Sequence, residues 1–205
     1  MEGFIVNLNR VKEEDLIVTI VSKKHLDTLY RFYGARHGVI NLGFKIDYEK
    51  ELSGKSSIGR LKDVIHIGYP WINNFKLLKL WQDFTALFYK HLKELEEIES
   101  FYFDILEESS KKWHKQNPKR VAIESYLKLL VYEGRLHQDK FCFLCSREIT
   151  TEVSLIRAFL PTHPTCSFSI GLNKKGLKEL LENKTTLYLS DVEVEYLWFI
   201  LLEGL

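Results

Sequence analysis

The residues with the clearest chemical potential lie between positions 142 and 166, a segment that holds every cysteine of the chain. Cys142 and Cys145 form a C-x-x-C pair, and His163 and Cys166 form an H-x-x-C pair after seventeen intervening residues. Two close pairs of such ligands suit a tetrahedral zinc ion, which lies about 2.0 to 2.3 Å from each ligand atom. The sequence therefore predicts zinc bound by these four side chains.

Four protein ligands would fill the coordination shell of the ion and leave no position for water, so the predicted zinc is structural. The alternative is that the cysteines are ordinary buried thiols and that His163 belongs to a turn in PTHPT. A zinc deaminase would need an upstream H-x-E or C-x-E and a proline directly before C-x-x-C. Phe141 stands at that position, and neither upstream motif occurs. A zinc-dependent hydrolase would need an exchangeable ligand, which three cysteines and a histidine disfavour.

Basic and aromatic residues alternate in TLYRFYGARHG, residues 28–38. Single-stranded nucleic acids are bound by such mixtures, because cations follow the phosphates and aromatic faces stack on bases. In a strand, however, Tyr30 and Phe32 would share one face, and Arg31 and Tyr33 the other. One aromatic set could therefore belong to the core, and the stretch by itself leaves both interpretations open.

The formal net charge of +1 conceals an uneven distribution of charge. Residues 23–62 carry nine basic and four acidic residues, a local charge of +5, whereas residues 93–108 carry seven acidic residues and one lysine, a local −6. A polyanionic partner is therefore possible for the N-terminal part. A second basic cluster, residues 111–120, is explained by lysines near a helix C-terminus, with binding of an acidic peptide or DNA as the alternative.

The N-terminal part has the pattern of β-strands. Residues 38–49 alternate apolar and polar side chains, which predicts a strand with one solvated face. Four further β-rich runs are expected at residues 3–9, 15–23, 26–34 and 61–68. Five short strands within about 70 residues predict a small barrel or sandwich.

After about residue 72 the apolar period becomes helical. Helices are expected over residues 75–98, 97–116, 120–134, 174–184 and 190–204. Gly134 suits the C-terminal end of the third helix, and Ser190 or Asp191 suits the N-cap of the last.

Several classes of protein receive no support from the sequence. It contains no Walker loop, G-x-G-x-x-G, G-x-S-x-G or H-E-x-x-H motif, and we expect no enzymatic activity. The start of the chain lacks the features of a secretory signal, and no apolar run approaches the roughly 18 residues of a membrane span. We therefore expect a cytoplasmic protein without membrane contact, in which thiols stay reduced.

In chain order, four segments resemble the family of the bacterial recombination mediator RecO. GFIVNLNRVKEEDLIVTIVS is similar to the opening of that family, and RFYGARH to its Gly-Ala-Arg block. ESYLKLLVYEGRLHQDKFCFLC resembles its helix, glycine and C-x-x-C sequence, and THPTC stands where many relatives have a second C-x-x-C. Here His163 replaces a cysteine, and the glycine-rich approach usual in the family is absent.

This resemblance implies an α+β protein with an N-terminal five-stranded OB-fold barrel and an all-helical domain. The DNA-binding barrel would cover residues 1–71, and the helical domain residues 72–205, with a Cys3His zinc insertion at 142–166. The family binds single- and double-stranded DNA and anneals complementary strands without nucleotide hydrolysis. It works with RecR and helps RecA to replace single-strand-binding protein, which implies a nucleoid-associated protein.

The resemblance also suggests DNA contacts. Arg10 and Arg36 match basic positions of the family, and the local charge adds five further candidates: Lys23, Lys24, Arg31, Lys45 and Arg60. The competing hypothesis is an adaptor whose OB-like barrel and zinc site mediate protein contacts without binding DNA. Salt-dependent DNA binding would separate the two hypotheses.

Overall fold

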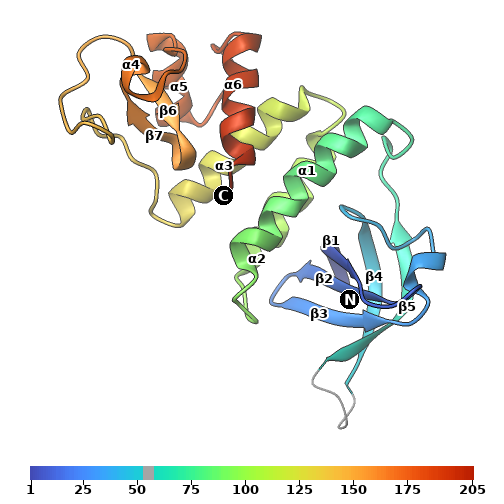
Figure 1. The fold of residues 1–205 in the computed structure, drawn as a ribbon. Coiled ribbons are helices and arrows are strands. Elements are labelled where there is room, and N and C mark those ends of the chain that lie inside the picture. The colour runs from blue at the N-terminus through green and yellow to red at the C-terminus, as the bar shows by residue number, and fades with distance from the viewer. Residues whose placement is uncertain (53–57) are drawn as a thin grey trace. The chain divides into compact units, whose positions relative to one another are not determined.

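The computed structural model describes residues 1–52 and 58–205, and the chain forms two compact units, residues 1–115 and 116–205 (Figure 1). Lys55, one of the nine basic residues counted above, lies outside the described residues. Among the described residues, no helix is long and apolar enough to cross a membrane.

The first unit begins with five strands that close into a barrel. They are β1 (Glu2–Arg10), β2 (Leu16–Ser22), β3 (Leu26–Arg31), β4 (Lys45–Glu51) and β5 (Gly59–Ile67). Their order around the barrel is β1-β2-β3-β5-β4; among the described residues β3 pairs with β5 in parallel, and the other four pairs are antiparallel. The predicted five-stranded OB-type barrel followed by helices is thus confirmed.

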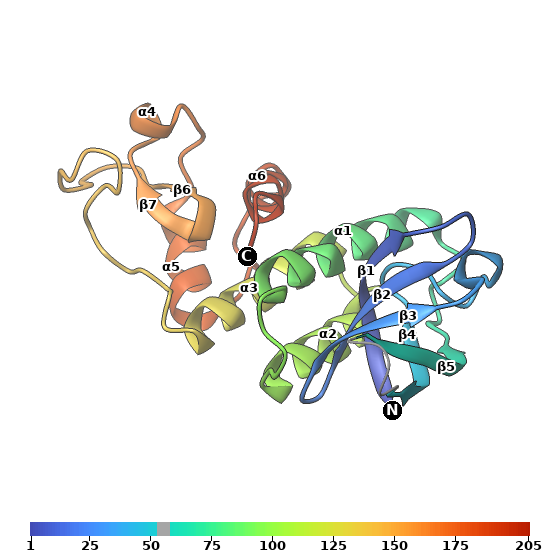
Figure 2. The same ribbon diagram turned by 60° about the horizontal axis from the view of Figure 1, so that its bottom comes forward.

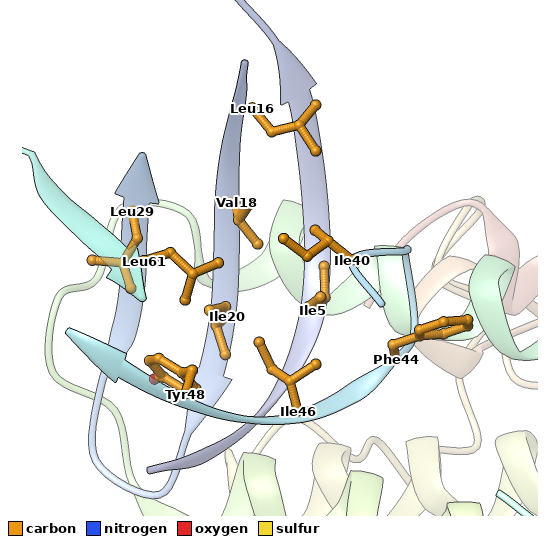
Figure 3. Close-up of a cluster of buried hydrophobic side chains, with 10 residues drawn as sticks. All are labelled: Ile5, Leu16, Val18, Ile20, Leu29, Ile40, Phe44, Ile46, Tyr48 and Leu61. Carbon is orange, nitrogen blue, oxygen red and sulfur yellow. The ribbon is translucent and has the colours of Figure 1, made fainter. Parts of the chain in front are cut away.

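Apolar side chains that alternate along the strands fill the interior of the barrel, as expected for a small closed barrel. Figure 3 shows this core, to which the strands and the β3–β4 connection contribute. Its members are Ile5, Leu16, Val18, Ile20, Leu29, Ile40, Phe44, Ile46, Tyr48 and Leu61.

The fourth strand is shorter than its sequence pattern predicts, since it begins at Lys45 instead of near residue 38. Gly43 adopts a left-handed φ of 79°, and its carbonyl accepts hydrogen bonds from Tyr69 Oη at 2.8 Å and Trp81 Nε1 at 2.7 Å. The alternating pattern predicted a strand from residue 38 because Ile40 and Phe44 are apolar. Both side chains are buried, as they would be in a strand, but they lie in the connection before β4. A three-residue helix, η1 (Gly34–Arg36), also lies in this connection.

Two helices complete the first unit. Helices α1 (Phe75–Leu92) and α2 (Ser100–Lys112) pack against β1 and β2 (Figure 2). Asn74 caps α1 by accepting from the backbone N–H groups of Lys76 and Leu77. The compact unit therefore extends beyond the barrel and past residue 71, the boundary expected from sequence.

The connection between these helices, residues 93–99, is acidic. It carries Glu94, Glu96, Glu97 and Glu99 and pairs with the β2–β3 turn. The backbone N–H of Leu26 donates to the Glu96 carbonyl, and that of Ile98 to the Lys24 carbonyl, both at 3.0 Å. Helix α1 therefore ends at Leu92, whereas its sequence pattern predicts a helix that continues to residue 98.

The second unit contains α3 (Pro118–Tyr132), α4 (Pro164–Ser167), α5 (Lys174–Asn183) and α6 (Asp191–Leu202), with α3 packed on α6. Ser190 and Glu193 form a capping box at the start of α6. An all-helical unit was expected, but the unit also contains two short strands. They are β6 (Ser154–Ile156) and β7 (Leu160–Thr162), which pair around the short helix η2 (Arg157–Phe159). Three-residue strands are too short to show a period in the sequence.

Candidate metal centre and nucleic-acid interface

The four predicted metal ligands come together in the second unit. Cys142 and Cys145 lie on a tight turn, in which the N–H of Ser146 donates to the Cys142 carbonyl at 2.8 Å. His163 is the N-cap of α4, and Cys166 lies within that helix. One ligand atom from each side chain lies within 4.8 Å of the others. The two sequence motifs therefore form one candidate metal centre.

The distances within the cluster fit a tetrahedral ion. Nδ1 of His163 lies 3.5 Å from Sγ of Cys145 and 3.7 Å from Sγ of Cys166. Bond lengths of about 2.3 Å to sulfur and about 2.0 Å to nitrogen place two tetrahedral ligand atoms about 3.5 Å apart. Nε2 of His163 lies 3.2 Å from the Glu148 carbonyl, which can fix the ring with Nδ1 toward the ion.

The surroundings of Cys142 favour its thiolate. Burial of the side chain opposes ionisation, but backbone N–H groups of His163, Cys145 and Leu144 point at the sulfur. The His163 N–H lies 3.5 Å from Sγ. These donors outweigh burial and lower the pKa of Cys142 to about 6. Thiolates are the form that binds metal, so the donor set fits zinc.

Hydroxyl groups of residues next to His163 and Cys166 in the chain form a network that was not predicted from sequence. Ser154 Oγ lies 2.6 Å from Ser169 Oγ and 2.7 Å from Tyr196 Oη. Ser167 Oγ lies 2.5 Å from Ser169 Oγ and accepts from Thr162 at 3.1 Å. These contacts connect the residues around His163 and Cys166 to α6. Scattered Ser and Thr residues give no sequence signal for such a network.

Four of the seven predicted DNA contacts lie at one end of the barrel. Arg10 pairs with Leu16, Leu16 with Arg31, and Tyr30 with Arg60 in the strand register. The N–H of Ala35 donates to the Glu14 carbonyl at 2.9 Å, which holds η1 and Arg36 beside the β1–β2 turn. We call this surface the aromatic end, defined by Arg10, Phe32, Tyr33, Arg36 and Arg60.

The basic side chains at this end of the barrel differ in how exposed they are and in which groups they already contact. The Arg36 side chain is 63% exposed and forms an ion pair with Glu14 at 2.5 Å. Arg60 is also exposed and lies 3.9 Å from Glu51. Arg31 is half-buried, and its Nη1 donates to the Leu61 carbonyl at 2.9 Å, which favours a structural role. Arg10 is exposed at the end of β1.

The other three candidates lie elsewhere. Lys23 and Lys24 occupy the β2–β3 turn, at the opposite end of the barrel and beside the acidic connection of residues 93–99. Lys45 is only 11% exposed, and its Nζ lies 2.7 Å from Glu2 and 2.9 Å from Glu107. Burial opposes its charge, but hydrogen bonds to Glu107 and Glu2 outweigh that effect and raise the pKa of Lys45. This placement favours a structural role for Lys45 over the phosphate contact that its charge suggested.

Substitution of Lys45 by Ala should therefore reduce stability and leave DNA affinity unchanged. We expect the free energy of unfolding in urea to fall by about 1 to 3 kcal/mol, because Glu107 loses a charged partner at a largely buried position. Lys79→Ala is the matched control, since it removes an exposed ion pair with Asp83 and should cost less than about 0.5 kcal/mol. Weaker DNA binding by folded Lys45→Ala would restore Lys45 to the interface.

The fold and these sites define a class of protein: an OB-fold barrel followed by helices, with a candidate metal centre in the helical part. OB folds that bind oligonucleotides use the face of strands 2 and 3 and the loops after strands 1 and 4. The β1–β2 turn lies at the aromatic end, and β4 also ends there, because Glu51 pairs with Arg60. Arg10, Arg36 and Arg60 thus lie at the end of the barrel that carries these two loops.

Residues 1–72 match the family model described as "RecO N terminal", so the chain is RecO-like over the barrel and the residues directly after it. No curated protein matches the chain.

Proposed function

We propose that the protein is a DNA-repair mediator that binds single- and double-stranded DNA and anneals complementary strands. In this proposal it works with RecR and single-strand-binding protein to promote loading of RecA. The match of the barrel to the RecO N-terminal model carries the proposal, because it supports a RecO-like role in DNA repair. The grouping of Arg10, Arg36 and Arg60 at one barrel end adds a physical basis for DNA contact.

The proposed mechanism is electrostatic and needs no catalytic group. Cations of the aromatic end would neutralise phosphates on two strands and reduce their mutual repulsion, so that complementary bases can meet. To bind a phosphate, Arg36 must first break its ion pair with Glu14. Exposed ion pairs contribute only about 0 to 1 kcal/mol, so this exchange costs little. A guanidinium can also bind phosphate through two parallel hydrogen bonds.

We further propose that Cys142, Cys145, His163 and Cys166 hold a structural zinc ion. Bound there, zinc would cross-link the turn at residues 142–146 to α4 and would supply no reactive ligand position. The ion would then stabilise the second unit, and the surface of that unit could contact protein partners.

Removal of cations from the aromatic end should reduce the salt dependence of DNA binding. We expect Arg36→Ala and Arg60→Ala each to weaken binding of a labelled 30-nucleotide strand and to reduce the slope of log affinity against log salt by about 0.7. Fluorescence anisotropy at several salt concentrations measures both quantities. Arg135→Ala, which removes an arginine of the second unit, is the control and should change neither. An unchanged slope in both variants would remove these arginines from the interface.

A protein-only adaptor is the second candidate, and one observation favours it. Arg36 and Arg60 face Glu14 and Glu51, and Lys62 also pairs with Glu51 at 2.6 Å, so local carboxylates partly offset the positive charge. The same titration separates the candidates. Absence of DNA binding by the wild-type protein at low salt would support the adaptor and contradict the mediator.

A further inference from the structure

Two consecutive aromatic residues at the aromatic end are both exposed. Phe32 is 47% exposed and Tyr33 is 56% exposed. Consecutive residues of a strand point to opposite faces, so a continued β3 would have turned one of these rings toward the core. Instead β3 ends at Arg31, and Tyr33 takes a left-handed backbone with φ 53° and ψ 26°. This change of direction brings both rings to the surface.

A buried carboxylate holds this conformation. Asp15 Oδ1 accepts from the backbone N–H of Tyr33 at 2.9 Å, and Asp15 Oδ2 accepts from Tyr30 Oη at 2.5 Å. A left-handed backbone is unfavourable for a residue with a side chain, and strain of this kind concentrates at functional sites. Asp15 thus acts as a positioning residue for a ring that contributes little to the core.

Each exposed ring has a cation beside it. The guanidinium carbon of Arg60 lies 5.2 Å from the centre of the Phe32 ring, and that of Arg36 lies 5.2 Å from the centre of the Tyr33 ring. Tyr30 packs edge-on against Phe32 with ring centres 4.8 Å apart, which supports Phe32 from the barrel side. A flat apolar surface next to a mobile positive charge is what a base and its adjoining phosphate require.

We propose that Phe32 and Tyr33 form a stacking surface for two unpaired bases of single-stranded DNA, while Arg60 and Arg36 move from the rings to the flanking phosphates. This inference rests on the proposed DNA-binding function and assigns two residues to its single-stranded ligand. Bases in a duplex are already stacked and cannot reach the rings. The surface should therefore favour single strands over duplexes, although both carry phosphates for the arginines.

An oligonucleotide without bases tests the inference on the wild-type protein. Binding of a labelled thymidine 20-mer is compared with that of an abasic strand of equal length and phosphate number, by anisotropy at one salt concentration. Stacking of two bases predicts that the thymidine strand binds about 30-fold more tightly or better. Equal affinities of the two strands would overturn the stacking surface while leaving phosphate binding intact.

The double variant Phe32→Ala/Tyr33→Ala assigns the effect to these rings. It should bind the thymidine strand about 30-fold more weakly, keep its affinity for a duplex and for the abasic strand, and keep the salt slope. The control Phe168→Ala/Phe199→Ala removes two exposed rings of the second unit and should change none of these quantities. A preference for bases that persists in Phe32→Ala/Tyr33→Ala would overturn the assignment. If the wild-type protein bound neither strand nor duplex, the proposed function itself would fail.

Discussion

Removal of metal from the purified protein should destabilise the second unit and leave the barrel folded. Cys142, Cys145, His163 and Cys166 join residues far apart in the chain, and binding energy of structural zinc is folding energy. Helices α3 and α6 also bury apolar side chains and contact each other, so the loss should be several kcal/mol instead of complete unfolding. For a unit of this size, each kcal/mol corresponds to about 4 to 8 °C in melting temperature.

The experiment combines metal analysis with thermal unfolding. We expect one zinc per chain by elemental mass spectrometry and a melting temperature more than about 10 °C lower after chelation or in Cys142→Ser. His163→Ala should act like Cys142→Ser, whereas the control His137→Ala removes an exposed histidine outside the cluster and should have little effect. Purified protein that lacks stoichiometric metal and tolerates Cys166→Ser would show that the cysteines are ordinary thiols.

Replacement of Trp81 by Ala should strongly destabilise the first unit. The Trp81 side chain is fully buried, and its Nε1 donates to the Gly43 carbonyl at 2.7 Å. Its ring contacts five aromatic neighbours: Phe4, Tyr69, Trp71, Phe84 and Trp113. Loss of a buried Trp of this kind costs about 3 to 5 kcal/mol.

Trp81→Phe is the matched variant for this prediction. It keeps most of the buried ring, and the Gly43 carbonyl still accepts from Tyr69 Oη at 2.8 Å. We expect it to cost about 1 to 2 kcal/mol in urea unfolding, clearly less than Trp81→Ala. Equal loss of stability in the two variants would mean that the hydrogen bond, and not the packing of α1 on the barrel, dominates at this position.

Sequence patterns predicted the barrel and the metal cluster for different reasons. Every second residue of a barrel strand faces the interior, as Leu16, Val18 and Ile20 do, and that period is visible in a single sequence. The ligands Cys142, Cys145, His163 and Cys166 are rare residue types in close pairs, so their spacing alone indicated a common site. Ser190 or Asp191 was expected as the N-cap of α6, because N-caps depend on local backbone geometry, and Ser190 takes that position.

Sequence patterns did not predict the features that depend on contacts between distant parts of the chain. Charge suggested that Lys45 contacts DNA, but its partner Glu107 lies sixty-two positions away, and only the fold brings the two together. The left-handed backbone of Tyr33 depends on Asp15, eighteen positions earlier. Alternation placed Tyr33 opposite Phe32, and no local signal indicates that β3 stops at Arg31. Period and composition do not report such contacts.

The acidic connection of residues 93–99 makes the charge of the first unit uneven along the barrel. Its four glutamates lie at the end of the barrel that carries Lys23 and Lys24, whereas Arg10, Arg36 and Arg60 lie at the other end. A polyanion approaching from solution exerts a torque on such a charge distribution, repelling one end and attracting the other. If the protein binds DNA as proposed, this charge distribution would favour encounters in which the aromatic end meets the strand first.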